Sequence, residues 1–160
     1  MTEPSAKRGS TETSRIIKAP RAKVYRACLD PEALAIWRAP DSMTGRMHAF
    51  DAREGGAYRM SLTYHDKTQS PGGKTSEDTD TFKGRFLELV PNEKIVELIA
   101  FESDDPRFAG EMTITTRFAD AGPGTQITML FENIPSGVSP QDNETGTQQS
   151  LRKLAALVEE

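Results

Sequence analysis

Few side chains in this sequence of 160 residues could carry acid–base, nucleophilic or metal chemistry. His48 and His65 are its only histidines and Cys28 is its only cysteine. The sequence has no HExxH spacing and no cysteine cluster, so it predicts no metal site. A structural or solvent-facing role is favoured for either histidine, and Cys28 falls on the apolar side of an expected helix, where a thiol is inert. We expect no catalytic residue and no cofactor; a non-enzymatic function is favoured, with catalysis left open.

Composition and charge narrow the class of protein. Hydrophobic residues make up 36% of the chain and charged residues 28%, as in ordinary folded domains. The 20 basic and 24 acidic residues are interspersed, which argues against a nucleic-acid-binding protein. No apolar run approaches the roughly 18 residues of a membrane span. No apolar stretch follows the basic residues near the start, so no secretory signal is expected and a cytoplasmic location is predicted.

In the first third of the chain, the apolar residues between Pro20 and Pro40 have helical periodicity. Residues 1–9 are small and polar and predict a disordered tail, and residues 10–160 predict one domain. A strand is expected over residues 10–17 and a short helix after Pro20. A second helix is expected from Asp30-Pro31 through Trp37, ending before Pro40, because the residue that precedes a proline avoids helical geometry.

From residue 43 onward the apolar residues alternate with polar ones, which is typical of half-buried strands. Strands are expected over 58–64, 81–90, 94–101, 111–119 and 125–131. The polar segment 65–80 predicts a mobile hairpin tip, and residues 133–143 predict a loop. A final helix carries Leu151, Leu154, Ala155 and Val158 in one apolar stripe. This order predicts an α+β fold, in which a curved antiparallel sheet holds the C-terminal helix in its concave face.

Two local features of the strand region have structural interpretations. Asp51 and Arg53 lie on one side of an extended segment, so we expect a salt bridge that braces the turn at Gly55-Gly56. Gly84 lies inside an expected strand and indicates a bend or bulge that curves the sheet.

Five ordered motifs resemble those of a known family. They are IKAPRAKVY (17–25), DPEALAIW (30–37), DAREGGAYR (51–59), GRFLELVPNEKI (84–95) and QSLRKLA (149–155). The resemblance covers about residues 15–158, and the chain is identified as similar to the START-like (SRPBCC) superfamily, within the C-terminal-domain family of the heat-shock-chaperone ATPase activator. The resemblance implies a helix-grip fold with a cavity between sheet and final helix. One departure is that Gly146-Thr147 stands where the family often has a glycine-tryptophan pair, so an aromatic cavity wall is missing there.

The candidate binding residues are the side chains expected between the sheet and the final helix. The predicted ligand-binding residues are Trp37, Tyr58, Met60, Leu62, Glu97, Phe101, Met112, Ile114, Met129, Phe131, Leu151 and Leu154. A packed core is the simpler interpretation of each apolar residue, whereas the resemblance implies a cavity lined in part by adaptable methionines. If Glu97 faces inward it needs a partner such as Arg59, Arg117 or a ligand group, and a bulge would turn it outward instead.

Three functions follow from this interpretation. The first is binding of a small hydrophobic or amphipathic ligand in the cavity. The second is a chaperone-associated or stress-response interaction protein, which the family resemblance implies. The third is an enzyme of the polyketide cyclase or hydrolase kind, which would need Glu97, Tyr58, Arg59 or His48 to point into the cavity. A homodimer through an edge strand or the hairpin is an open alternative.

Overall fold

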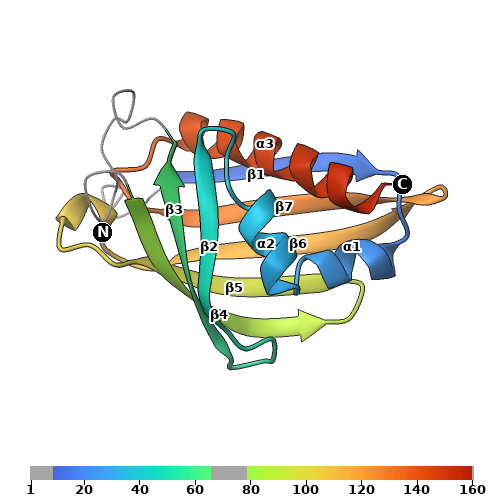
Figure 1. Cartoon of the computed structure of the whole chain (residues 1–160), viewed down its shortest axis with the longest axis horizontal. Helices are drawn as coiled ribbons and strands as arrows, with labels where there is room; N and C mark the ends of the chain where they lie inside the picture. Colours follow the sequence, from blue (N-terminus) through green and yellow to red (C-terminus); the bar gives the residue numbers. More distant parts are fainter. Residues whose placement is uncertain (1–8, 66–78, 160) are drawn as a thin grey trace, which may run out of the picture.

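Seven antiparallel strands form one curved sheet in the computed structural model, which describes residues 9–65 and 79–159 (Figure 1). The order across the sheet is β1-β7-β6-β5-β4-β3-β2, so every neighbouring pair except β1–β7 is consecutive in sequence. The strands are β1 (Gly9–Ile17), β2 (Met43–Phe50), β3 (Ala57–Tyr64), β4 (Thr79–Val90), β5 (Lys94–Phe101), β6 (Met112–Ala121) and β7 (Gly124–Ile134). The predicted α+β helix-grip fold is confirmed.

Three α-helices of the described residues cover the concave side of the sheet. Helices α1 (Arg21–Ala27) and α2 (Pro31–Trp37) connect β1 to β2, and α3 (Pro140–Val158) closes the chain. Asp30 caps α2 by accepting hydrogen bonds from the backbone N–H groups of Glu32 and Ala33. Pro31 occupies the first helical position, where no backbone N–H is needed. The structure therefore confirms that the two helices begin where they were expected, after Pro20 and at Asp30-Pro31.

The core lies between the inner face of the sheet and α3. Alternation along each strand sends one set of side chains inward, and the stripe on α3 meets them. Leu151 and Leu154 are 1% and 0% exposed. Trp37 is fully buried, and its indole N–H donates to the carbonyl oxygen of Ala27 at 3.0 Å, which fastens α2 onto α1. The core of the helix-grip fold is thus built by the residues whose periodicity predicted it.

Several expected boundaries differ from the structure. The expected loop over residues 133–143 is wrong at both ends, because β7 continues to Ile134 and α3 begins at Pro140. Ser139 caps α3 by accepting a hydrogen bond from the Asp142 N–H at 3.3 Å. Gly9, assigned to the expected tail, begins β1, and residues 1–8 lie outside the described residues. Of the expected hairpin tip, residues 66–78 also lie outside them, and β4 already begins at Thr79.

Gly84 is not the site of a bulge, and a bend at this residue stays a prediction. The register between β4 and β5 shifts between Phe86 and Glu88, so the bulge lies beyond Gly84. A Cβ at Gly84 would lie 2.2 Å from the ring of Tyr58, which shows that the glycine makes room for this side chain. The expected salt bridge between Arg53 and Asp51 is present at 2.7 Å.

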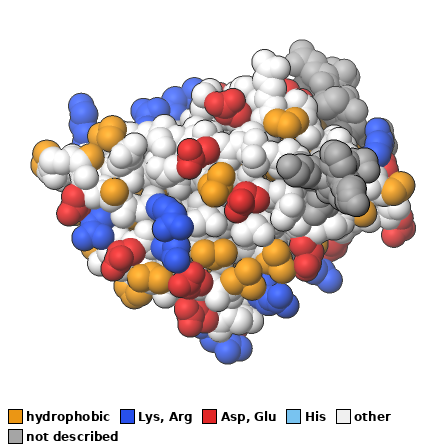
Figure 2. Space-filling view, turned by 180° about the vertical axis from the view of Figure 1, so that it is seen from behind, with side chains coloured by type: hydrophobic (Ala, Val, Ile, Leu, Met, Phe, Trp, Pro, Cys, Tyr) orange, Lys and Arg blue, Asp and Glu red, His pale blue; other side chains and the backbone are white. Residues whose placement is uncertain are grey.

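Charged side chains of both signs are interspersed on the face of the molecule shown in Figure 2. Lys and Arg side chains there stand beside Asp and Glu side chains, with small apolar groups between them. This distribution agrees with the interspersed charges of the sequence and its net charge of −4. None of the described helices is both long enough and apolar enough to cross a membrane.

Candidate functional site

A cavity of about 720 Å³ lies between the concave face of the sheet and the first half of α3. A volume of this size is in the range of small-molecule sites. Along its second half α3 packs into the core, where Leu151, Leu154 and Val158 are buried. Its first half carries polar and small residues that do not fill the space between helix and sheet.

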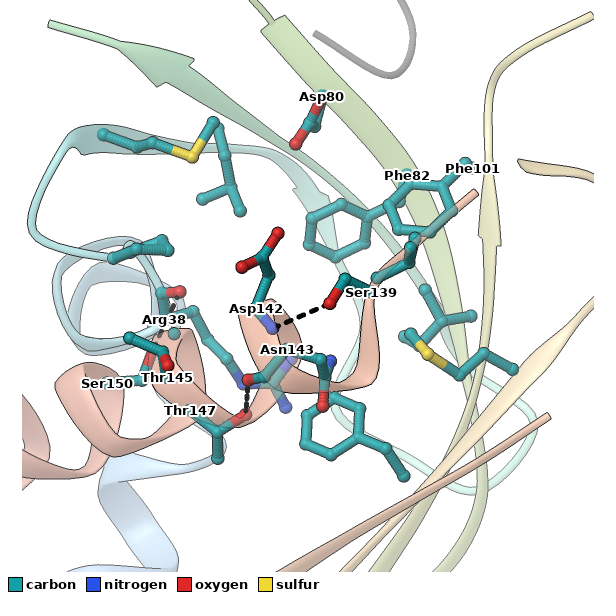
Figure 3. A pocket seen from close by; sticks show the side chains of 18 of the residues that line it. Arg38, Asp80, Phe82, Phe101, Ser139, Asp142, Asn143, Thr145, Thr147 and Ser150 are labelled. Carbon is teal, nitrogen blue, oxygen red and sulfur yellow. Dashed lines mark hydrogen bonds between the residues drawn. The ribbon is translucent and has the colours of Figure 1, made fainter. Parts of the chain in front are cut away.

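The two walls of the cavity differ in chemistry. The sheet supplies an apolar wall that consists mainly of Leu62, Phe82, Ile99, Phe101, Met112, Ile114, Met129 and Phe131. The opposite wall, on α3, consists of Asp142, Asn143, Thr145, Gly146, Thr147, Gln149 and Ser150. Figure 3 shows Phe82 and Phe101 on the strands facing the polar residues of the helix. The arrangement matches a molecule that has one apolar and one polar side.

Arg38 is the charged residue that reaches the cavity from the end of α2, and α3 fixes its backbone. The Ser150 hydroxyl donates to the Arg38 carbonyl oxygen at 3.2 Å. Lys153 Nζ donates to the carbonyl oxygens of Ala39 at 2.7 Å and Pro40 at 3.3 Å. These bonds satisfy carbonyl groups that the end of a helix leaves without partners. These hydrogen bonds from α3 thereby fix the position of the Arg38 backbone, from which the side chain extends.

Glu97 holds the Arg38 side chain from the sheet. Arg38 Nη2 donates to Glu97 Oε2 at 2.8 Å and to Oε1 at 3.0 Å. The hydroxyl of Tyr58 donates to Glu97 Oε1 at 2.6 Å. The side chains of Arg38 and Glu97 are only 12% and 3% exposed, so a buried ion pair forms the inner end of the site. The guanidinium carbon also lies 5.1 Å from the ring centre of Trp37, in cation–π range.

Burial and mutual charge keep this network in one protonation state. Burial is the main cause that raises the pKa of Tyr58 well above its ordinary value, and the Glu97 carboxylate adds to the shift. Burial by itself lowers the pKa of Arg38, but Glu97 and Tyr58 reverse this, so the net shift is upward. The phenol thus remains protonated and the guanidinium remains charged at neutral pH.

The outer part of the cavity has acidic character. Burial raises the pKa of Tyr64, and the nearby carboxylates of Asp80 and Asp142 raise it further. Asp105 is paired with Arg107, whose Nη2 lies 2.6 Å from Oδ2. Hydrogen bonds from the Arg107 side chain, and then from its backbone N–H, hold the pKa of Asp105 below its ordinary value. The Asp105–Arg107 pair adds no net charge, whereas Asp142 adds a negative one.

The structure divides the predicted site residues into two sets. Six of them line the cavity: Leu62, Phe101, Met112, Ile114, Met129 and Phe131. The other six, Trp37, Tyr58, Met60, Glu97, Leu151 and Leu154, are buried beside the cavity and are not among the residues that line it. A role in ligand binding for either set stays a prediction. Glu97 faces inward with Ile95 and Ile99, but Arg38 pairs with it instead of Arg59 or Arg117.

Sequence reasoning missed Arg38 and part of both walls. An arginine directly after a short helix is expected to be exposed. The sequence indicated only that Glu97, if buried, would need a cationic partner, and it did not identify Arg38 as that partner. Phe82 and Ile99 were detectable, since each continues the inward alternation of an expected strand. The polar wall on α3 was not, because Asp142 and Asn143 fall in the expected loop and the polar residues after them are typical of an exposed helix face.

The remaining candidates for chemistry lie away from the cavity. His48 is exposed and hydrogen-bonded to Ser61 at 2.7 Å, and His65 is exposed and bonded to Thr44 at 2.6 Å. Cys28 is buried, and burial raises the pKa of its thiol to about 12. Among residues 9–65 and 79–159, no three His, Cys, Asp or Glu side chains gather as a metal site. Arg59 points away from the cavity and pairs with Glu102 at 2.7 Å.

Comparison with solved structures identifies similar proteins. A crystal structure of a protein from Chromobacterium violaceum is 37% identical, with a TM-score of 0.83, and the match covers 94% of this chain and 97% of that one. A crystal structure from Mycobacterium smegmatis is 16% identical, with a TM-score of 0.72 over 93% and 90% of the two chains. An AHSA1-like protein from Aeromonas hydrophila, solved by NMR, is 17% identical, with a TM-score of 0.69 over 94% and 92%. The last two share the fold alone.

Comparison at the level of families gives the assignment. None of the curated proteins matches the chain. A family model described as "Activator of Hsp90 ATPase homolog 1-like protein" matches residues 18–159, which is most of the chain. This match agrees with the order of the five sequence motifs and with the helix-grip fold of the START-like (SRPBCC) superfamily. The chain therefore belongs to the family of Activator of Hsp90 ATPase homolog 1-like proteins.

Proposed function

We propose that this protein binds a small amphipathic molecule in the cavity between the sheet and α3. The observation that supports the proposal is the cavity itself, about 720 Å³ in volume, with an apolar wall on the sheet and a polar wall on the helix. A solid core would place apolar side chains on both walls. Polar groups on one wall instead are suited to the head of a ligand, while its apolar body packs on the other. A cytoplasmic location is part of the proposal and rests on the sequence.

The apolar wall is suited to ligands of varied shape. Met112 and Met129 line the cavity from the adjacent strands β6 and β7, and their unbranched side chains adapt to irregular partners. Phe82, Phe101 and Phe108 follow one another edge to face with ring centres 6.2 and 6.3 Å apart, and they offer both ring faces and ring edges to an aromatic ligand. These features favour compact ring-containing ligands over long straight chains.

The experiment is a thermal-shift screen with aromatic ketones, sterols and fatty acids, repeated on a matched pair of variants. Leu62→Trp places a large side chain in the cavity wall. Leu87→Trp makes the same change on β4 at a side chain that is 44% exposed and is not among those lining the cavity. A ligand that stabilises the wild type and Leu87→Trp but not Leu62→Trp supports the proposal. No stabilisation by any compound, or equal stabilisation of both variants, contradicts it.

A second candidate function is interaction with a chaperone ATPase, and the family description supports it. In that case the sheet or hairpin surface would contact the partner and the cavity would not be required. Stimulation of a chaperone ATPase by the wild type and by Leu62→Trp alike would support this candidate. Absence of both stimulation and retention in a pull-down would remove it.

A further inference from the structure

Among the described residues, Arg38 is the cationic group at the inner end of the cavity, and its hydrogen-bonding capacity is only partly used. A guanidinium has five N–H donors in a fixed plane. Nη2 is occupied by the two oxygens of Glu97. Within the described part of the chain, the buried Nε has no hydrogen-bond partner. Nε is enclosed and cannot be reached from the cavity, but the Arg38 side chain is 12% exposed and lines the cavity, so a ligand oxygen that accepts from the exposed edge of the guanidinium would gain a charge-assisted hydrogen bond.

The charge of Arg38 is already balanced. Glu97 lies 2.8 Å from the guanidinium, and Tyr58 donates to the same carboxylate. A ligand carboxylate or phosphate would bring a second negative charge beside Glu97 in a poorly solvated site. Asp142 on the opposite wall would repel it as well. A neutral oxygen can accept a hydrogen bond from the guanidinium without this cost.

A ligand cation meets the opposite difficulty at this end of the cavity. Its charge would face the guanidinium of Arg38 across a short distance in a site with little water. An ammonium group could approach Asp142 on the opposite wall instead, but it would give the Arg38 guanidinium no acceptor. The inner end therefore disfavours either sign of charge.

We propose that the cavity selects uncharged molecules that place a carbonyl or hydroxyl oxygen against the Arg38 guanidinium and an apolar ring system against Phe82, Phe101 and Ile114. The proposal rests on the proposed function and adds the chemical class of the ligand. Glu97 is a positioning residue in this account, because it acts on the ligand through the charge and orientation of Arg38. Its removal is expected to change which head group is preferred.

The test compares four naphthalenes that share one apolar body. Acetylnaphthalene carries a neutral acceptor, ethylnaphthalene has no polar atom, naphthoate is an anion and naphthylmethylamine is a cation at neutral pH. Dissociation constants are measured by calorimetry on the wild-type protein. We expect acetylnaphthalene to bind about tenfold or more tightly than each of the others, since a hydrogen bond to a charged group contributes roughly that factor.

Variants of the ion pair make the test independent of folding defects. Glu97→Gln leaves the Arg38 charge unbalanced, so the preference is expected to move toward naphthoate by about tenfold or more. Glu102→Gln is the matched control, because it removes a carboxylate from the Arg59 pair outside the cavity. In the double variant Arg38→Met with Glu97→Leu, acetylnaphthalene and ethylnaphthalene are expected to bind equally.

The outcomes separate this inference from the proposed function. Equal wild-type binding of acetylnaphthalene and ethylnaphthalene, or tighter binding of naphthoate, overturns the inference while the cavity remains a binding site. An unchanged preference in Glu97→Gln also overturns it. Absence of binding by all four compounds overturns the inference, whereas the proposed function fails only if the thermal-shift screen also finds no ligand.

Discussion

Gly84 on β4 lies directly opposite Tyr58 on β3, and the tyrosine ring occupies the space where a Cβ of residue 84 would stand. The Tyr58 hydroxyl in turn donates to Glu97, which holds Arg38 at the cavity. A glycine inside a strand, unfavourable for the strand by itself, thus permits the network that forms the inner end of the site.

The first prediction compares Gly84→Ala with Gly146→Ala. At Gly84 the added methyl group would lie 2.2 Å from the Tyr58 ring, so we expect a loss of about 1–3 kcal/mol in the free energy of unfolding. At Gly146, inside α3, the nearest atom is Pro40 Cγ at 3.7 Å, so better helix propensity should add about 0.5–1 kcal/mol. Urea denaturation of both variants checks this. The same sign for both changes would contradict it.

The second prediction concerns the buried pair of Arg38 and Glu97. Arg38→Met leaves Glu97 buried without its cation, and we expect a loss of about 3–5 kcal/mol. The double variant Arg38→Met with Glu97→Leu should recover part of this loss, because no buried charge remains, although the Tyr58 hydroxyl loses its acceptor. The measurement is the free energy of unfolding of each variant. A double variant no more stable than Arg38→Met would show that the pair does not behave as a coupled unit.

The pair of Arg38 and Glu97 shows how far the sequence alone allows the site to be predicted. Alternation placed Glu97 on one face with Ile95, Ile99 and Phe101, but a bulge on either strand could have reversed that face. The bulge lies at Leu87 on β4, and Glu97 faces inward. Arg38 could not be predicted as the partner, because the contact joins the end of α2 to a strand 59 residues later.

The cavity illustrates a second limit of the sequence. Leu151 and Met129 both carry the inward periodicity of core residues, and both are buried. Only Met129 lines the cavity, whereas Leu151 packs into the core beside it. Periodicity identifies the buried face of an element, whereas the position of an unfilled space depends on how the elements are placed against each other.

The third prediction is that Cys28 reacts slowly in the native protein. Burial raises the pKa of the thiol to about 12, so almost no thiolate is present at pH 8. We expect labelling by iodoacetamide to be much slower in the native state than in urea. A native rate similar to that of the unfolded chain would show that the thiol is accessible and ionised.

The fourth prediction concerns the pH dependence of the contact between α3 and the segment after α2. Arg152 donates to both carboxylate oxygens of Asp41, and these bonds lower the pKa of Asp41 below its ordinary value of 3.8. A carboxyl group with a lowered pKa in the folded state stabilises the protein above its unfolded-state pKa. That contribution is lost as the pH falls through the folded-state pKa.

The variant Arg152→Gln tests the direction of this pH dependence of stability. The difference in unfolding free energy between wild type and variant should be constant above about pH 5 and should shrink below pH 3.8. Arg117→Gln, at another exposed arginine, is the control and should show no such change. A difference that grows on acidification would contradict the prediction.

The most direct test of ligand binding in the cavity is methyl NMR of protein labelled at isoleucine and methionine and titrated with acetylnaphthalene. We predict shift changes at the methyl groups that line the cavity, those of Met43, Ile99, Met112, Ile114 and Met129, with intermolecular contacts to the ring protons. Ile17 and Ile127, which are buried but are not among the lining residues, serve as internal controls and should stay unchanged. Shifts confined to the exposed Ile16 and Ile36, or no shifts at all, would contradict the account.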